Sequence, residues 1–72
     1  MALFVDKCSD TSFKVFNMKH QLLYRGATTS KILSLQVDGN SVVASCEGHH
    51  NWLFGPNNPD RPEQSWRMLR RF

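Results

Sequence analysis

Apolar and polar residues alternate along the chain in short runs, and this pattern is typical of β-strands separated by turns. We interpret residues 2–54 as an antiparallel meander of about five strands, forming either an open sheet or a small barrel. The polar stretch 6–12 is predicted to be a connection. The candidate strands are FKVFNM (13–18), QLLYR (21–25), KILSLQV (31–37), SVVASC (41–46) and HHNWLF (49–54), and they follow a short apolar run, ALFV (2–5).

Turn-forming residues separate these runs. The sequence DGN (38–40) is the strongest turn signal, because Asp and Asn tolerate left-handed backbone angles and Gly adopts them freely. Lys19 and His20 are predicted to close a hairpin, and GATTS (26–30) is predicted to be a loop. The stretch GPNNPDRP (55–62) contains all three prolines of the chain, so we expect an irregular loop there.

The C-terminal segment 62–72 has a pattern that predicts an amphipathic helix. At about 100° per residue its apolar side chains fill one arc and its arginines fill the opposite arc. Asp60 and Glu63 fit a capping box, and Pro62 suits a first helical turn. The fold class expected is therefore mainly β, with a C-terminal basic helix covering the sheet. A strand over 62–72 is the alternative, in which each face would carry one misfit residue.

Size and composition indicate one small domain spanning residues 1–72. A chain of 72 residues buries only about 60% of its unfolded surface, and the apolar content of 40% is enough for one small core. The N-terminus lacks the apolar run of a secretion signal or a membrane span, so we expect a cytoplasmic protein without membrane association. In a reducing compartment Cys8 and Cys46 are expected to be free thiols.

The net charge of +3 arises entirely from the last twelve residues. Residues 1–60 contain five basic and five acidic side chains, whereas residues 61–72 contain four arginines and one glutamate. The arginines could contact phosphate groups of nucleic acid, or they could form a solvated face that also complements the helix dipole. These residues are Arg61, Arg67, Arg70 and Arg71.

The sequence CEGHHNW (46–52) places a cysteine, a glutamate and two histidines close together. In a strand, adjacent side chains point to opposite faces, so His49 and His50 are poorly placed to hold one ion. Zinc needs three or four ligands, and the other soft donors are remote. No nucleophile-elbow glycines surround the cysteines, and no phosphate-binding loop is present. We therefore predict a non-enzymatic protein with no catalytic residues, no cofactor and no metal.

Residues 13–54 resemble a single WD-type propeller repeat. VFN (15–17) stands where such a repeat often has Trp-Asp, KILSLQVDGNSVVAS (31–45) is similar to its central hairpin, and NWLF (51–54) is similar to the next outer strand. The Gly-His and Trp-Asp pairs are missing. One repeat cannot bury its faces alone, so the resemblance implies either self-association or another way of closing the sheet. We assign no family from it and retain the twisted meander.

The leading functional hypothesis is a small protein-interaction module, because Trp and Arg are frequent interface anchors. Nucleic-acid binding without sequence preference, through the basic C-terminal segment, is the alternative. A second alternative is a metal-binding or thiol-dependent activity at Cys46 and His49. Homo-oligomerisation also stays open. The predicted partner-binding residues are Trp52, Arg61, Arg67, Arg70 and Arg71.

Overall fold

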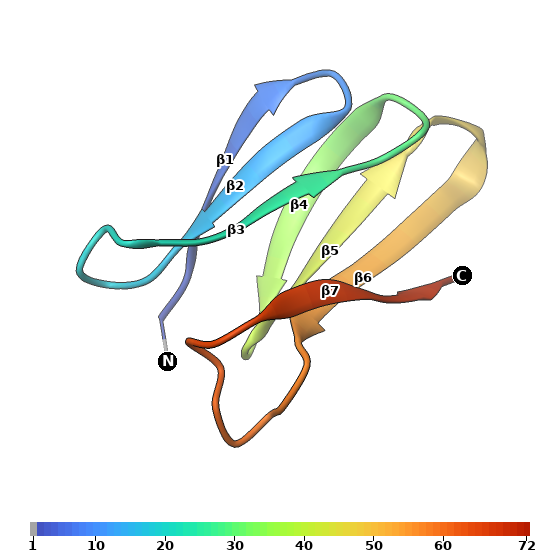
Figure 1. Ribbon diagram of the computed structural model, residues 1–72. Coiled ribbons are helices and arrows are strands. Elements are labelled where there is room, and N and C mark those ends of the chain that lie inside the picture. Colours follow the sequence, from blue (N-terminus) through green and yellow to red (C-terminus); the bar gives the residue numbers. More distant parts are fainter. Residues whose placement is uncertain (1) are drawn as a thin grey trace.

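The computed structural model describes residues 2–72, which form seven strands and one 3-10 turn (Figure 1). The first three strands make sheet A, in the order β1-β2-β3, and the last four make sheet B, in the order β4-β5-β6-β7. All pairings are antiparallel. The elements are β1 (Phe4–Ser9), β2 (Ser12–Phe16), β3 (Leu22–Ala27), β4 (Ile32–Asp38), β5 (Ser41–Cys46), η1 (Glu47–His49), β6 (His50–Pro56) and β7 (Trp66–Arg71).

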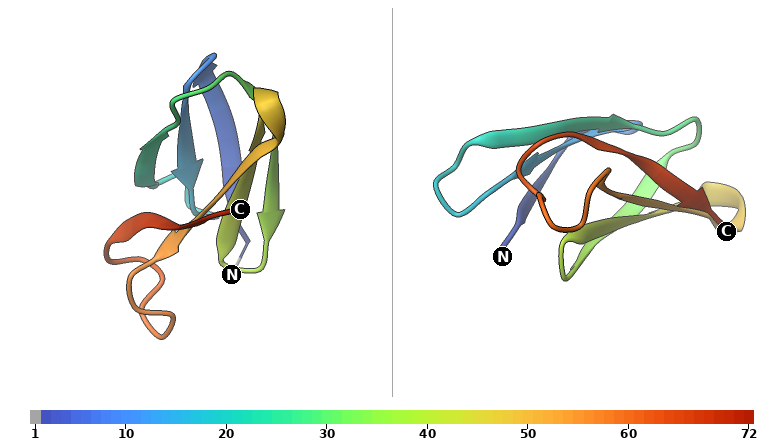
Figure 2. Two further views of the ribbon diagram at one scale, coloured as in Figure 1. Left: turned by 90° about the vertical axis from the view of Figure 1, so that its right-hand side faces the viewer. Right: turned by 60° about the horizontal axis from the view of Figure 1, so that its bottom comes forward.

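The two sheets pack face to face and enclose the core between them (Figure 2). Alternation along the middle strands explains this, because every second residue of β2 and β5 is buried. The Phe13 ring of sheet A meets the Phe54 ring of sheet B edge to face, with centroids 4.9 Å apart. The largest fully buried side chains of the core are Phe13, Phe54, Ile32, Val15 and Val42.

The sheets also approach each other along two edges. β1 lies beside β4 and β3 lies beside β7, but within residues 2–72 no strand ladder crosses either boundary. The rings of Tyr24 and Trp66 stack at the β3–β7 boundary with centroids 6.0 Å apart. We call this boundary the β3–β7 seam. Beyond it, the two strands separate toward the C-terminus (Figure 2).

The predicted hairpin turns are confirmed. Gly39 has φ of 60° in the turn between β4 and β5. In the turn between β2 and β3, His20 takes φ of 60°, and Asn17 Oδ1 accepts hydrogen bonds from the backbone N–H groups of Lys19 and Gln21 at 2.9 and 3.0 Å. The Asn17 side chain therefore closes a turn that Lys-His alone closes poorly.

The prediction of a mainly β antiparallel fold is confirmed, but the strand count of about five is wrong. The stretch 6–12, expected to be a connection, contains most of β1 and its turn into β2. β1 is an edge strand whose residues are mostly exposed, so its sequence lacks the apolar alternation of a half-buried strand. The first strand is thus Phe4–Ser9, which begins within the short apolar run 2–5 and continues through the expected connection.

The predicted C-terminal helix over 62–72 is also wrong, because Trp66–Arg71 forms strand β7 against β6. A helix of about ten residues is marginal on its own, whereas pairing satisfies the backbone of both this segment and the free edge of β6. A bulge at Leu69 shifts the alternation and moves Arg70 off the core-facing side. The proline-containing loop accordingly runs from 57 to 65, since β6 continues to Pro56.

None of the elements formed by residues 2–72 is a helix long and apolar enough to cross a membrane.

Candidate partner-binding surface

The outer face of sheet B combines exposed apolar side chains with two arginines. Pairing places Arg70 opposite Leu53, and Leu53 opposite Val43, so these side chains form one row across three strands. Arg67 lies in the neighbouring row, opposite Gly55. We call this surface the arginine face and define it by Val43, Leu53, Arg67, Leu69, Arg70 and Phe72.

The apolar centre of the arginine face is open to solvent. Leu69 is 38% exposed and Phe72 is 56% exposed. Leu69 is the bulged residue of β7 and lies over Gly55, where an added Cβ would come within 2.8 Å of Leu69 Cδ1. Phe72 is held in the sheet by two backbone hydrogen bonds with Asn51, of 2.9 and 3.0 Å. Rigid backbone therefore presents both apolar side chains to solvent.

The arginines of this face have no carboxylate partner. The single ion pair within residues 2–72 joins Lys7 to Asp10 at 3.8 Å, remote in sequence from both arginines. The guanidinium of Arg70 instead lies 5.3 Å from the centroid of the Phe72 ring. This cation–π contact gives Phe72 a preferred position and leaves the guanidinium N–H groups free to bind an anion.

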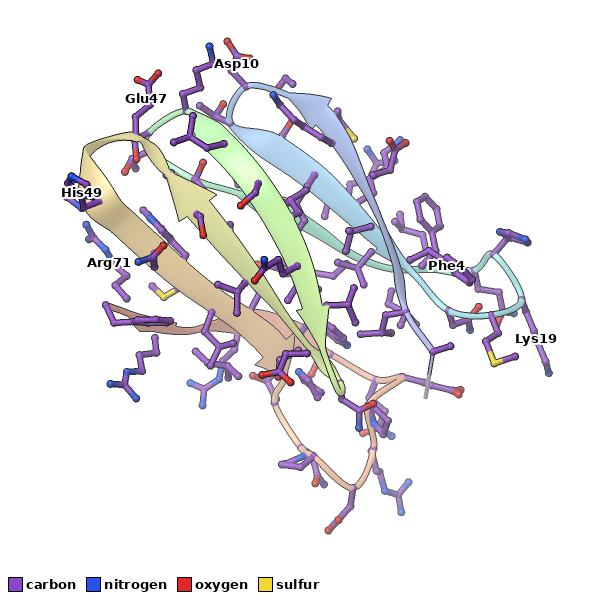
Figure 3. The ribbon with its side chains drawn as sticks, turned by 180° about the vertical axis from the view of Figure 1, so that it is seen from behind. Phe4, Asp10, Lys19, Glu47, His49 and Arg71 are labelled. Carbon is purple, nitrogen blue, oxygen red and sulfur yellow. The ribbon has the colours of Figure 1, made fainter. Side chains whose placement is uncertain are left out.

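Arg71 lies on the other side of β7. Its guanidinium stands 4.7 Å from the centroid of the Trp52 ring, which stacks on Phe54 with an interplanar angle of 6°. Trp52 is only 7% exposed and belongs to the core. Arg71 therefore contacts Trp52 and does not belong to the arginine face. It lies at the end of the sandwich near His49 of η1 (Figure 3).

Arg61 is the last of the predicted partner-binding residues, and it lies in the exposed loop 57–65. Its backbone N–H donates to the Asn58 carbonyl at 2.9 Å, and the Trp66 indole N–H donates to the Pro62 carbonyl at 2.8 Å. These bonds order the loop beside the start of β7. Of the five residues that the sequence predicted, the structure thus places Arg67 and Arg70 on one face, pairs Arg71 with Trp52 elsewhere, and leaves Arg61 in the loop.

The CEGHHNW segment forms the end of β5, the turn η1 and the start of β6. Cys46 is buried, and both Cys8 and Cys46 are free thiols. Gly48 and His49 take positive φ of 78° and 62°, so the chain reverses sharply there. Across residues 2–72, no three side chains of His, Cys, Asp or Glu stand close enough together to hold a metal ion.

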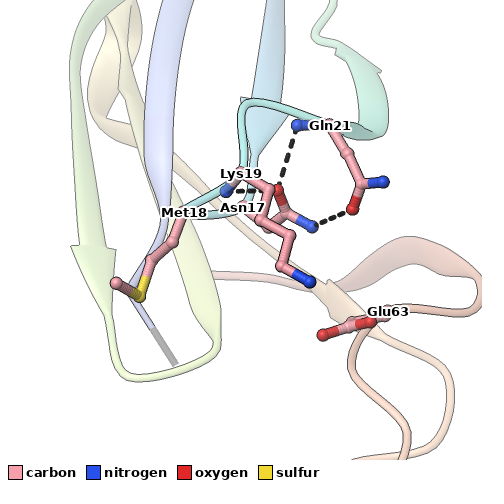
Figure 4. Close-up of a pocket in the computed structure, with 5 residues that line it drawn as sticks. All are labelled: Asn17, Met18, Lys19, Gln21 and Glu63. Carbon is pink, nitrogen blue, oxygen red and sulfur yellow. Dashed lines mark hydrogen bonds between the residues drawn. The ribbon is translucent and has the colours of Figure 1, made fainter.

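A surface pocket of about 180 Å³ lies at the opposite end of the molecule, beside the β2–β3 turn (Figure 4). Asn17 and Gln21 line it, but their side chains already bond to each other at 2.8 Å, and Asn17 Oδ1 serves the turn. The remaining walls are Met18, Lys19 and Glu63. The polar groups of this pocket therefore act mainly in holding the turn.

One pattern in the sequence indicates part of the arginine face. In the strand alternative for 62–72, Leu69 is the misfit residue on a face that otherwise carries Arg67 and Arg71, which indicates an exposed apolar side chain beside arginines. Comparison of the chain with known protein families, with curated proteins and with solved structures finds no match in any of the three.

Proposed function

We propose that this chain is a small non-enzymatic protein-interaction module whose arginine face docks a partner protein. The observation that carries the proposal is the exposure of Leu69 and Phe72 beside Arg67 and Arg70, which have no carboxylate partner within the described residues. Interfaces combine an apolar centre with arginine and aromatic anchors in this way. Strand pairing fixes the backbone of the face, so docking costs little ordering entropy.

A partner protein suits this face better than a nucleic acid does. Non-specific binding of single strands relies on aromatic rings that stack on successive bases. Trp52 and Trp66 are each 7% exposed, which leaves Phe72 as the aromatic ring of the face, and Arg70 already lies over it. The nucleic-acid hypothesis also relied on three clustered arginines, and Arg71 lies apart from the other two.

A random-peptide display selection on the immobilised domain tests the proposal. We expect recovered peptides to lose at least about tenfold in affinity against a Leu69→Ser/Phe72→Ser variant, because truncating a central anchor removes more than about 1.4 kcal/mol of binding free energy. The matched control is Phe4→Ser/Leu22→Ser, which alters side chains of similar exposure on the outer face of sheet A. Its binding should be unchanged.

Unfolding midpoints of both double variants establish that each remains folded. The proposal fails if the recovered peptides depend on Phe4 and Leu22 in place of Leu69 and Phe72. It also fails if a mixed-sequence oligonucleotide binds the arginine face and displaces the peptides.

A further inference from the structure

We infer that the partner segment is acidic and that it crosses the β3–β7 seam, where Arg25 and Lys14 of sheet A act together with Arg67 of sheet B. This inference rests on the proposed function and extends the same surface onto the other sheet. It identifies the partner by its carboxylates and adds two residues that lie outside the C-terminal segment.

The stacked pair Tyr24 and Trp66 fixes the geometry of the seam. Both rings pack toward the interior, with centroids 6.0 Å apart and an interplanar angle of 27°. β3 and β7 run in the same general direction (Figure 1). Because successive residues of a strand point to opposite faces, the next residue of each strand, Arg25 and Arg67, points to the outer surface on its own side of the seam.

Lys14 extends this arrangement by one strand. It is the Cα partner of Arg25 in the β2–β3 pair, and its neighbours Phe13 and Val15 are both buried, so Lys14 also points outward. Lys14, Arg25 and Arg67 therefore form a cationic strip across three strands of two different sheets. In the described chain, none of the three has a carboxylate within ion-pair distance.

Acidic residues limit the strip at both ends. Asp6 is the Cα partner of Lys14 on β1. On the other side, the row that contains Arg67 continues across sheet B to Asp38. Arg67 is opposite Gly55, a Cβ added to Gly55 would lie 3.1 Å from Ser41 Oγ, and Ser41 is the Cα partner of Asp38. A phosphate backbone continuing beyond the strip would meet these carboxylates. A short acidic segment fits between them.

The apolar side chains beside the strip favour carboxylates of a protein segment as its ligand. Guanidinium groups bind carboxylates and phosphates alike with two parallel hydrogen bonds, so the two arginines at the seam establish only that the ligand is an anion. Leu69 and Phe72 offer apolar contact on the adjoining part of β7. The occupant is therefore a segment with several Asp or Glu residues beside one or two large apolar residues.

The test uses the full chain and a synthetic peptide with four glutamates around a Leu-Phe pair. Chemical-shift changes of backbone amides measure the dissociation constant, including weak binding in the millimolar range. We expect Arg25→Gln and Arg67→Gln each to weaken binding about two- to fivefold, since each removes one exposed ion pair. Lys31→Gln removes a charge from the β3–β4 connection and should leave the affinity unchanged.

Each remaining outcome decides a separate point. If Arg67→Gln weakens binding and Arg25→Gln does not, the partner stays on sheet B; the inference is then overturned and the proposed function stands. Equal affinity for a peptide with glutamine in place of glutamate overturns the acidic character. Absence of peptide binding, or tighter binding of a mixed-sequence oligonucleotide, overturns the inference as well. Peptide binding that ignores Leu69→Ser/Phe72→Ser contradicts the proposed function itself.

Discussion

The Phe13 ring covers the α-carbon of Gly26, its paired residue on the neighbouring strand β3. A side chain at position 26 would overlap three carbons of that ring. Phe13 is 1% exposed and also contacts the rings of Tyr24 and Phe54. Because Gly26 has no side chain, the Phe13 ring can lie over it and contact Phe54 of sheet B.

Replacing Gly26 with alanine is expected to destabilise the fold by about 1–3 kcal/mol, because the new Cβ forces the Phe13 ring out of its site. Urea unfolding followed by tryptophan fluorescence measures the loss. In a Phe13→Leu background, where the smaller side chain no longer lies over position 26, the same glycine change should lower the unfolding free energy clearly less. Equal costs in both backgrounds would show that the ring is not the obstacle.

Asn17 is expected to be the most sensitive polar position in the turns. It is buried, and Asn17→Ala leaves the backbone N–H groups of Lys19 and Gln21 without their acceptor. Each lost hydrogen bond of this part-buried kind costs about 0.5–1.5 kcal/mol, so the unfolding free energy should fall by about 1–3 kcal/mol. Gln21→Ala removes one side-chain bond only and should cost about 1 kcal/mol. The ranking is wrong if the two variants unfold at the same urea concentration.

The two thiols should react at very different rates. Cys8 is exposed on β1, and Cys46 is buried in the core at 3% exposure. A disulfide exchange reagent should modify Cys8 in the folded protein, while Cys46 reacts only when the sheets open. Single Cys→Ser variants assign the two phases. Rapid reaction of the thiol at position 46 in the Cys8→Ser variant would mean that the sandwich opens locally at β5.

Ionisation of Tyr24 is expected to lower the unfolding free energy at alkaline pH. Burial raises the pKa of this phenol above its ordinary value of 10.0, so the folded chain keeps the proton at a pH where the unfolded chain releases it. The contribution of Tyr24 to stability is complete below about pH 10 and is lost as the pH rises above that value. Unfolding measured from pH 9 to 11 should show a smaller decline for Tyr24→Phe. A decline of the same size in both proteins would assign it to other groups.

Strands with a clear core face could be predicted from the sequence, and edge strands could not. Phe13 and Val15 alternate with polar residues, and the turn at Gly39 is marked by its own chemistry, so β2, β4 and β5 lie close to their predicted positions. β1 buries little, and its polar residues Asp6 and Lys7 resemble a loop. It forms a strand because it pairs with β2, and its own residues do not indicate that pairing.

The prediction of a helix over the C-terminal segment 62–72 was wrong for a different reason. Strict alternation over 66–72 puts Arg70 beside Trp66 and Met68, which argues against a strand. The bulge at Leu69 adds one residue and removes that conflict, but a bulge depends on the register against β6 and leaves no local mark in the sequence. The arginine face was missed with it, because its members come together only through that pairing.

The change of sheet between β3 and β4 divides the chain into consecutive halves. Every strand ladder joins neighbours in sequence, so sheet A is complete by Ala27 and sheet B begins at Ile32. Contact order within each half is low, which favours rapid local pairing, and the contact of Phe13 with Phe54 forms only when the halves dock. Neither half buries its apolar face alone. A chain cleaved in the 28–31 connection should therefore behave as two complementary fragments that restore the fold on mixing.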